Sequence, residues 1–351
     1  MTVLIVQNIH VLSQALRPLC NCGMSFSDDM ILHKRWLCLR SPTTMSTDQV
    51  NLNNVPALKE YYELLVRRRK AAALDPLRRG WICVVELPPY PVPTDGHYRP
   101  LPSYAHNGGT YQLVLVDAPL PFQHDEQYSQ VWVADVHSLG MCKRNLGRVI
   151  LKIIQPSLLP LPDLDWYLEV YDYVRPWTLW TSEDRAYREL EPLQGKTVPY
   201  YFGKHEITMP GGEDAQVLIM EYVQGKTLEE WLEDRPAHEA PEDLGEDNEA
   251  YVEQTKQMLR KILLGVHAIN KLGVGHNDMR PGNIIITPSG DPVVFDFAMA
   301  GCNVDPDQVR ERFGNPVMAT GPLRDCCTQH DEEIANWIGD ELEKPNSWVR
   351  Y

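Results

Sequence analysis

Basic residues are scarce relative to acidic ones in this sequence. Its 351 residues include 33 Lys and Arg against 48 Asp and Glu, which gives a formal net charge of −15. Proteins bind nucleic acid largely by neutralising phosphates with Lys and Arg, so the excess of acid argues against a nucleic-acid partner. Hydrophobic residues make up 43% of the chain, which is enough for a sizeable core.

Long apolar runs are also missing. No stretch approaches the roughly 18–20 residues that a membrane helix needs. Residues 1–12 are apolar but are interrupted by polar residues, and no positive charge precedes Arg17. A secretory signal instead places a basic end before an unbroken apolar run. We therefore expect no membrane partner and an intracellular protein, in the cytoplasm or the nucleus.

The cysteines lack the spacing of a zinc site. The eight of them include no C-x-x-C pair and have no pair of histidines nearby, whereas zinc ligands are typically spaced in these ways. We expect them to be reduced residues that pack in the interior.

The first third of the chain divides into two segments. Residues 1–54 show little periodicity and are expected to form a poorly organised extension. Residues 55–119 are expected to hold a helix over 56–74, where apolar residues recur at three- and four-residue steps, and a Pro-rich connector over 87–103. We expect the basic run at 67–70, near the end of that helix, to face solvent.

The rest of the chain begins with strands and one helix and ends mostly in helix. Short apolar runs typical of strands lie at 111–116, 131–136, 149–154 and 217–222. Helical composition or periodicity covers 183–193 and 251–272.

The most specific pattern follows the second of these helices. Two short apolar runs, 284–287 and 292–295, flank a turn and predict a hairpin. Asp296 directly follows the second run, so the hairpin brings it back towards Asp278 and Asn283, which precede the first. Two carboxylates and an amide oxygen suit Mg²⁺, which is usually bound together with substrate phosphates.

This segment resembles the catalytic segment of the protein kinase superfamily. His276-Asn277-Asp278 stands where that family has H-R-D, and Asn283 follows at the spacing of its loop asparagine. Asp296-Phe297-Ala298 stands where the family has D-F-G. The interval between the two aspartates also fits the family.

The resemblance implies an α+β fold with the two lobes of a protein kinase. A small β-rich N-terminal lobe and hinge would occupy 120–223, and a shortened, mostly helical C-terminal lobe would occupy 224–351. The chain is similar to the short, divergent kinase-like proteins found in fungi. The resemblance implies ATP and Mg²⁺ as cofactors, and a protein substrate or binding partner.

The same resemblance implies further site residues. Lys152 is the one charge in the strand-like run VILKII and resembles the family's lysine that contacts the α- and β-phosphates of the nucleotide. Its expected partner is Glu183 on the following helix, preferred over Glu189. Glu221 and Val223 lie where the family has its hinge, and their main chain would form hydrogen bonds with adenine.

The family mechanism then implies a role for each residue. Asp278 would orient the attacking hydroxyl, and Arg280 would stabilise charge on the transferring group. Asn283 and Asp296 would hold Mg²⁺, and Lys152 would position the phosphates. Catalysis would rest on positioning and electrostatics, with no covalent step.

Some positions depart from the family pattern. The stretch HDEQYSQ before Val131 has no glycine, although a glycine-rich loop that approaches the phosphates is expected there. Asn277 replaces the arginine of H-R-D, Arg280 replaces a lysine, and Ala298 replaces the glycine of D-F-G. No A-P-E motif follows.

Three functions stay open from the sequence. The first is an ATP-dependent kinase of protein Ser or Thr, and the second is a small-molecule kinase of the aminoglycoside or choline type. The third is a pseudokinase that serves as a binding or scaffold module. Lys152, Asp278, Asn283 and Asp296 favour an enzyme, whereas the missing glycines and the short C-terminal lobe favour the scaffold.

Overall fold

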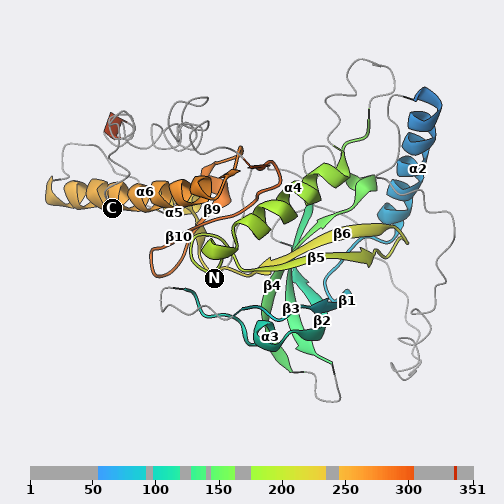
Figure 1. Ribbon diagram of the computed structural model, residues 1–351, viewed down its shortest axis with the longest axis horizontal. Helices are drawn as coiled ribbons and strands as arrows, with labels where there is room; N and C mark the ends of the chain where they lie inside the picture. Colours follow the sequence, from blue (N-terminus) through green and yellow to red (C-terminus); the bar gives the residue numbers. More distant parts are fainter. Residues whose placement is uncertain are drawn as a thin grey trace, which may run out of the picture.

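The computed structural model describes residues 54–91, 98–118, 128–139, 144–162, 175–234, 245–303 and 336–337. Figure 1 shows two parts, a twisted sheet crossed by helix α4 and a second part built along the long helix α6. Across these residues, no helix is both long enough and apolar enough to span a membrane. The extension predicted at 1–54 lies outside them except for its last residue.

Six antiparallel strands form the main sheet in the order β1-β2-β3-β4-β6-β5 (Figure 1). The four strand-like runs of the sequence are present as β2, β3, β4 and β6, each somewhat longer than predicted. The strands are Ile82–Leu87 (β1), Gly109–Asp117 (β2), Gln130–Ser138 (β3), Asn145–Ile154 (β4), Tyr201–Thr208 (β5) and Asp214–Glu221 (β6).

The sheet begins earlier in the chain than the sequence predicted. β1 pairs with β2 from Ile82 opposite Val114 to Leu87 opposite Gly109, so the sheet extends across the boundary predicted at residues 119 and 120. β1 is a short run beside the Pro-rich stretch. β5 carries three consecutive polar residues, 204–206, at its centre and contains Gly203 at a φ of 100°. The apolar run of β1 is only four residues long, 82–85, and β5 has no such run.

The predicted helices are present with different ends. α2 spans Val55–Leu74, and the side chain of Asn54 caps its first turn by accepting a hydrogen bond from Ala57 N at 3.3 Å. α4 spans Pro176–Glu189 and so begins well before residue 183, because its aromatic first turns bury Leu179 and Trp180. α6 spans Gly245–Lys271. The short helix α3, Ser103–Asn107, begins at the last residue of the predicted connector.

The second part contains the hairpin that the sequence predicted. β9 (Ile284–Ile286) and β10 (Pro292–Val294) pair antiparallel, and β7 (Lys226–Thr227) pairs with the other edge of β9. α5 (Leu228–Glu233) begins with a capping box between Thr227 and Glu230. Two further short strands, β8 (Val274–Gly275) and β11 (Gly301–Cys302), pair with each other.

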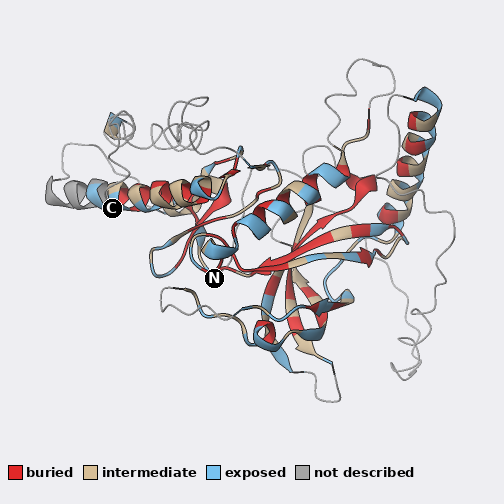
Figure 2. Ribbon diagram, viewed as in Figure 1, coloured by how far each residue is buried: buried red, intermediate tan, exposed pale blue. Residues whose placement is uncertain are grey.

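Strand alternation divides the core between the two faces of the sheet. Val149, Leu151 and Ile153 on β4 are fully buried on one face, in a cluster that also contains buried residues of β1 and α3. Ile154 belongs to the other cluster, between the sheet and α4, α6 and the hairpin. Successive side chains of a strand point to opposite faces, so Lys152 shares the α4 side with Ile154. Figure 2 accordingly shows the main sheet largely buried.

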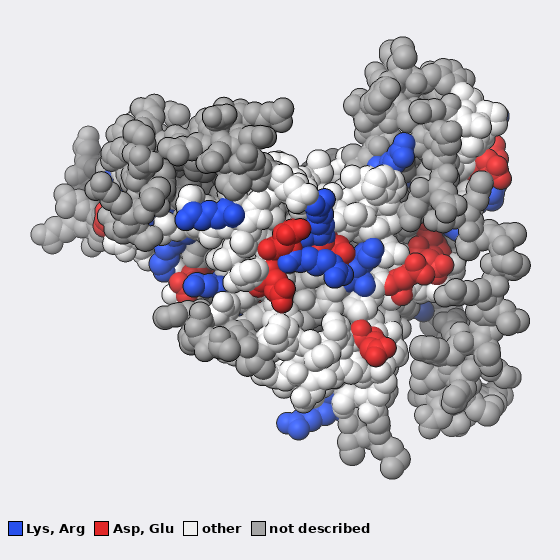
Figure 3. Space-filling view, in the orientation of Figure 1, with Lys and Arg blue, Asp and Glu red and all other residues white. Residues whose placement is uncertain are grey.

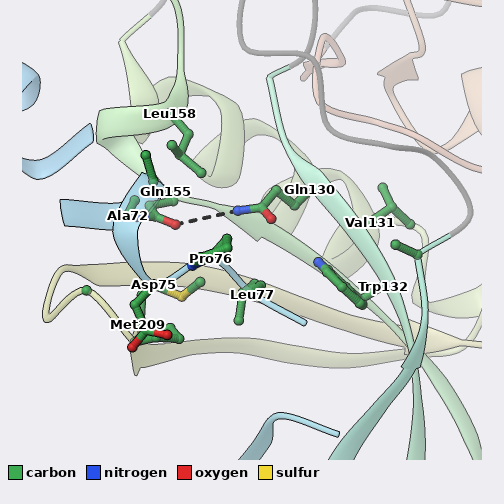
Figure 4. Close-up of a pocket in the computed structure, with 14 residues that line it drawn as sticks. Ala72, Asp75, Pro76, Leu77, Gln130, Val131, Trp132, Gln155, Leu158 and Met209 are labelled. Carbon is green, nitrogen blue, oxygen red and sulfur yellow. Dashed lines mark hydrogen bonds between the residues drawn. The ribbon is translucent and has the colours of Figure 1, made fainter. Parts of the chain in front are cut away.

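A cavity of about 330 Å³ lies at the edge of the main sheet, between the end of α2, the start of β3 and the turn after β5. Figure 4 shows Trp132 and Leu158 on its walls and the hydrogen bond of 3.5 Å from Gln130 to Gln155 beside it. None of the residues predicted to carry chemistry lines it. The polar groups described next, and not this cavity, therefore define the candidate site.

Candidate active site

Lys152 occupies the centre of the site. It projects from β4, and its side chain is 9% exposed. Its Nζ lies 2.6 Å from Oε2 of Glu183 and 2.5 Å from Oδ1 of Asp296. The lysine that the sequence singled out is therefore held between two carboxylates from distant parts of the chain.

Glu183 reaches Lys152 because of its position on α4. The buried residues of α4 recur at helical spacing, and Glu183 lies on that face between Trp180 and Tyr187. Its side chain is 0% exposed. Glu189 lies on the solvent side and is 4.0 Å from Arg185. The predicted ion pair between Lys152 and Glu183 is thus present, and Glu189, the less favoured partner, lies near Arg185 instead.

The outer face of α4 carries charges of both signs. Arg185 and Glu189 form an exposed pair at 4.0 Å, one turn apart on the helix. Figure 3 shows acidic and basic side chains lying next to one another across the middle of this view. Such exposed pairs contribute little to stability. They differ in this from the buried pair of Lys152 and Glu183 on the inner face, because breaking a buried pair is costly.

The charges of the cluster explain the shifted pKa values. Burial lowers the pKa of Lys152, but the carboxylates of Asp296 and Glu183 outweigh burial and hold it above its usual value. Burial raises the pKa of Glu183 to about 7, with Asp296 adding to the rise and Lys152 opposing it. Asp296 is 30% exposed, and the positive charge of Lys152 keeps its pKa below the usual value despite burial. One cation thus serves two carboxylates.

Asp296 is positioned by the end of the hairpin. It follows β10 and adopts a φ of 67°, a left-handed conformation that turns the chain sharply. The next residue, Phe297, is fully buried, with its ring 5.2 Å from that of Tyr187 and 4.7 Å from that of His276. The buried ring fixes the backbone on one side of Asp296.

His276 connects this turn to the loop that holds Asp278. Its Nε2 lies 2.8 Å from the carbonyl oxygen of Phe295, and the N–H of Asp278 donates to its Nδ1 at 3.3 Å. Burial lowers the pKa of His276, and a neutral ring with its proton on Nε2 satisfies both partners. The histidine therefore ties Asp278 to the strand that leads into Asp296.

A second polar group surrounds Asp278. The amide nitrogen of Asn283 donates to the carbonyl oxygen of Asp278 at 2.8 Å and to its Oδ2 at 3.2 Å. Nε of Arg280 lies 3.6 Å from the same Oδ2, and the side chains of Asp278 and Arg280 are 43% and 45% exposed. Asn277 donates to the carbonyl oxygen of Met299 at 3.1 Å, in the segment after Asp296. Hydrogen bonds within the loop and to the segment after Asp296 hold the loop in place, while the carboxylate of Asp278 stays open to solvent.

An acidic residue that the sequence did not single out lies near this loop. Burial and Glu233 raise the pKa of Glu229 on α5, and the positive charge of Arg280 opposes that rise. The helix and the loop are brought together by the pairing of β7 with β9.

The predicted hinge residues lie at the end of β6. Glu221 donates its N–H to the carbonyl oxygen of Tyr200 at 2.8 Å, and Val223 is buried against Ile285 and Val293. The side chain of Glu221 pairs with Arg99 at 2.8 Å, a residue that the sequence placed in an irregular connector.

Comparisons with known proteins agree with this geometry. A family model described as "Protein kinase domain" matches residues 180–319, which include Glu183, Glu221, Asp278 and Asp296. The matched region is protein kinase-like. Lys152 lies before this kinase-like region, so its assignment rests on the contacts that it makes.

Curated relatives match the chain in part. It is 26% identical over 172 residues to "Serine/threonine-protein kinases drp72" of Corynebacterium efficiens, covering 49% of this chain and 27% of that protein. It is 28% identical to "Serine/threonine-protein kinase 17A" of Oryctolagus cuniculus, covering 34% and 28%. It is 32% identical to "Serine/threonine-protein kinase GRIK2" of Arabidopsis thaliana, covering 31% and 24%. The chain therefore spans 24–28% of the lengths of these three relatives.

Proposed function

We propose that this protein transfers the γ-phosphoryl group of ATP to serine or threonine hydroxyls of another protein. One observation carries the proposal: Nζ of Lys152 lies 2.6 Å from Glu183 and 2.5 Å from Asp296. A lysine that carboxylates hold in place presents a fixed positive charge, which suits nucleotide phosphates. The names of the relatives support the class of acceptor.

Lys152 and Glu183 form the proposed phosphate-positioning pair. Lys152 contacts the α- and β-phosphates, and Glu183 orients its ammonium group from α4. Glu183 is 0% exposed, whereas Asp296 is 30% exposed. Asp296 is therefore the carboxylate on the accessible side, where the nucleotide would enter. The main chain of Glu221 and Val223 is the proposed contact for adenine.

Asn283 and Asp296 are the proposed ligands of Mg²⁺. Asn283 uses its amide nitrogen on Asp278, which leaves its amide oxygen available as a hard ligand. In the part of the chain that the structure describes, no group of three or more His, Cys, Asp or Glu side chains is arranged to hold a metal, so the nucleotide phosphates would complete the coordination. When bound, the ion neutralises charge on the β- and γ-phosphate oxygens.

Asp278 is the proposed residue that orients the acceptor. Its exposed carboxylate takes the hydroxyl proton while the acceptor oxygen bonds to the γ-phosphorus and the bond to the β–γ bridging oxygen breaks. Arg280, 3.6 Å away, stabilises the charge on the transferring phosphoryl group. The electrostatic contributions resemble those of phosphoryl transfer in general, because charge stabilisation and positioning supply most of the catalysis.

A pseudokinase that binds partners without catalysis is the second candidate. The observation that favours it is the absence of glycine from residues 118–129, between β2 and β3. Glycines at that place let main-chain amides approach phosphates closely. Without them, the nucleotide would rely on Lys152 and the hinge for its affinity.

Phosphoryl transfer from radiolabelled ATP, measured with the wild type and with Asp278→Ala, tests the proposal. A generic protein acceptor is compared with a panel of amino-alcohols and aminoglycosides. We expect the wild type to label protein. We expect the variant to lose about 100-fold or more of this transfer, the scale of losing a general base, with ATP affinity nearly intact because Asp278 faces the acceptor.

Asp234→Ala is the matched control, because Asp234 is 55% exposed and pairs with Lys226 at the surface. It should retain full transfer. Transfer to small molecules alone would instead assign a small-molecule kinase. A folded wild type that labels nothing would favour the scaffold, and transfer that survives in Asp278→Ala would refute the role of Asp278.

A further inference from the structure

Arg99 donates four side-chain hydrogen bonds near the proposed hinge, although it lies 122 residues before Glu221. Its Nε donates to Oε1 of Glu221 at 2.8 Å, and its Nη2 donates to Oε2 at 2.8 Å. This is the two-pronged geometry in which arginine holds a carboxylate most firmly. Arg99 precedes α3, in the Pro-rich segment expected to be an irregular connector.

The same guanidinium group also holds the loop between α4 and β5. Nη1 donates to the carbonyl oxygen of Lys196 at 2.7 Å, and Nη2 donates to that of Val198 at 2.9 Å. The main chain of Arg99 adds two contacts, from its N–H to Gly195 O at 2.7 Å and from the Tyr200 hydroxyl to its carbonyl oxygen at 2.7 Å. Arg99 therefore joins Glu221 to residues 195–200.

Residues 194–198 connect in turn to the other parts of the candidate site. The carbonyl oxygen of Thr197 accepts from the N–H of Val294 at 2.8 Å, on the strand that leads into Asp296. The amide nitrogen of Gln194 donates to the carbonyl oxygen of Tyr187 at 2.7 Å, on α4. Arg99 thus binds both the hinge residue Glu221 and the segment that contacts the end of α4 and the strand before Asp296.

Glu221 depends on this arginine for its charge balance. The side chains of Glu221 and Arg99 are 9% and 20% exposed. The carboxylate also accepts from the N–H of Tyr200 at 3.0 Å. A buried carboxylate that loses its cation is strongly unfavourable, so removing Arg99 would drive Glu221 towards water and displace the main chain at this point.

We propose that Arg99 is a positioning residue that fixes the main chain of Glu221 for recognition of the adenine base. The inference rests on the proposed function, since it assigns Glu221 to nucleotide binding. Arg99 acts through Glu221 and through residues 195–200, not on the phosphates. Its loss should therefore weaken recognition of the base while leaving recognition of the Mg²⁺-bound phosphates largely unchanged.

The first test measures hydrogen exchange in Arg99→Ala without nucleotide. The amides of Tyr200 and Val294 should exchange faster than in the wild type, because the residues that accept or support their hydrogen bonds are no longer held. Arg79→Ala is the matched control, since Arg79 precedes the same sheet but pairs with Asp117 while 72% exposed. Unchanged exchange in Arg99→Ala would overturn the proposal.

The second test measures how tightly the same proteins bind ATP, GTP and tripolyphosphate, each in the presence of Mg²⁺. Arg99→Ala should lose about tenfold or more in affinity for ATP, on the scale of losing a buried charge pair, and tripolyphosphate affinity should change by less than about twofold. The preference for ATP over GTP should fall. Arg99→Lys keeps the charge but not the two-pronged contact, so it should not restore that preference.

The outcomes separate this inference from the function on which it rests. Equal losses for ATP and tripolyphosphate, or an unchanged preference for ATP in Arg99→Ala, would refute the role of Arg99 while the wild type still bound nucleotide. A wild type that bound neither ATP nor tripolyphosphate would refute the proposed function, and base positioning with it.

Discussion

The two polar groups of the candidate site differ most in their access to solvent. Lys152 on strand β4 and Glu183 on helix α4 are 9% and 0% exposed. Asp278 and Arg280, in contrast, lie on a loop and are 43% and 45% exposed. The first group is fixed by burial before any ligand arrives. The second keeps an open carboxylate. A site that prearranges one substrate and admits another needs this division.

The division also separates stability from chemistry. A buried ion pair that loses one partner leaves an uncompensated charge in the interior, whereas an exposed pair contributes little. Changes to the buried group should therefore affect folding and nucleotide binding together. Changes at Asp278 should affect transfer alone.

The largest expected effect follows from Lys152→Met. This change leaves the carboxylates of Glu183 and Asp296 without their shared cation, so the free energy of unfolding should fall by about 3–5 kcal/mol. ATP binding should be lost as well. Chemical denaturation and ATP titration measure the two effects.

Lys226→Met is the control for that experiment, because Lys226 is 53% exposed and pairs with Asp234. It should change the free energy of unfolding by less than about 1 kcal/mol. Similar effects of the two lysines would remove the distinction between the buried and the exposed group.

The pH dependence of stability should reveal the raised pKa of Glu183. Between its ordinary pKa of 4.5 and about 7, the folded protein keeps a proton that the unfolded chain releases. The contribution of Glu183 to stability must then decrease as the pH rises through this window, whereas the lowered pKa values of His205, His267 and His276 contribute in the opposite sense. Glu183→Gln should remove the part of the slope that belongs to Glu183, which amounts to about 3 kcal/mol at most.

Chemical denaturation at several pH values checks this expectation, and Glu189→Gln provides the control on the solvent side of the same helix. The wild type and Glu189→Gln should show the same slope. A slope that was the same in Glu183→Gln as in the wild type would mean that the titrating group lies elsewhere.

A smaller effect is expected from Arg69→Ala on α2. Arg69 donates from Nε to the carbonyl oxygen of Ser157 at 2.7 Å and from Nη2 to that of Leu159. These residues follow β4, which carries Lys152. Losing these hydrogen bonds should lower the free energy of unfolding by about 1–3 kcal/mol, as chemical denaturation would show.

Arg67→Ala tests whether that effect belongs to Arg69 itself. Arg67 is exposed on the same helix, so its removal should be nearly neutral. Equal losses in the two variants would show that the basic run acts only through its general charge.

The sequence predicted the elements whose signal is local. The hairpin from 284 to 294 and the strand of Lys152 follow from short apolar runs, and the helix of Glu183 follows from helical composition. Alternation along β4 then places Lys152 on the side of α4. The motif around Asp278 and Asp296 indicated the remaining residues of the site. Strand and helix patterns therefore accounted for the elements that carry the chemistry.

The contacts that the sequence did not predict are long-range and polar. The basic run at 67–70 was expected to face solvent, yet Arg69 contacts Ser157, 88 residues away, and Arg68 lies 3.7 Å from the buried Glu213. The acceptors of Arg69 are main-chain carbonyls, which leave no trace in residue type. The pairing of Arg99 with Glu221 was missed because no periodicity links positions so far apart.

The most direct test of the account is the thermal shift produced by ATP, with and without Mg²⁺, in the wild type and in Asp296→Asn. A ligand that binds only the folded state raises the melting temperature. ATP should stabilise the wild type, and Mg²⁺ should increase that shift. Asp296→Asn should keep most of the metal-free shift and lose the increase. A wild type that shows no shift at millimolar ATP, or a variant that loses both shifts equally, would contradict the account.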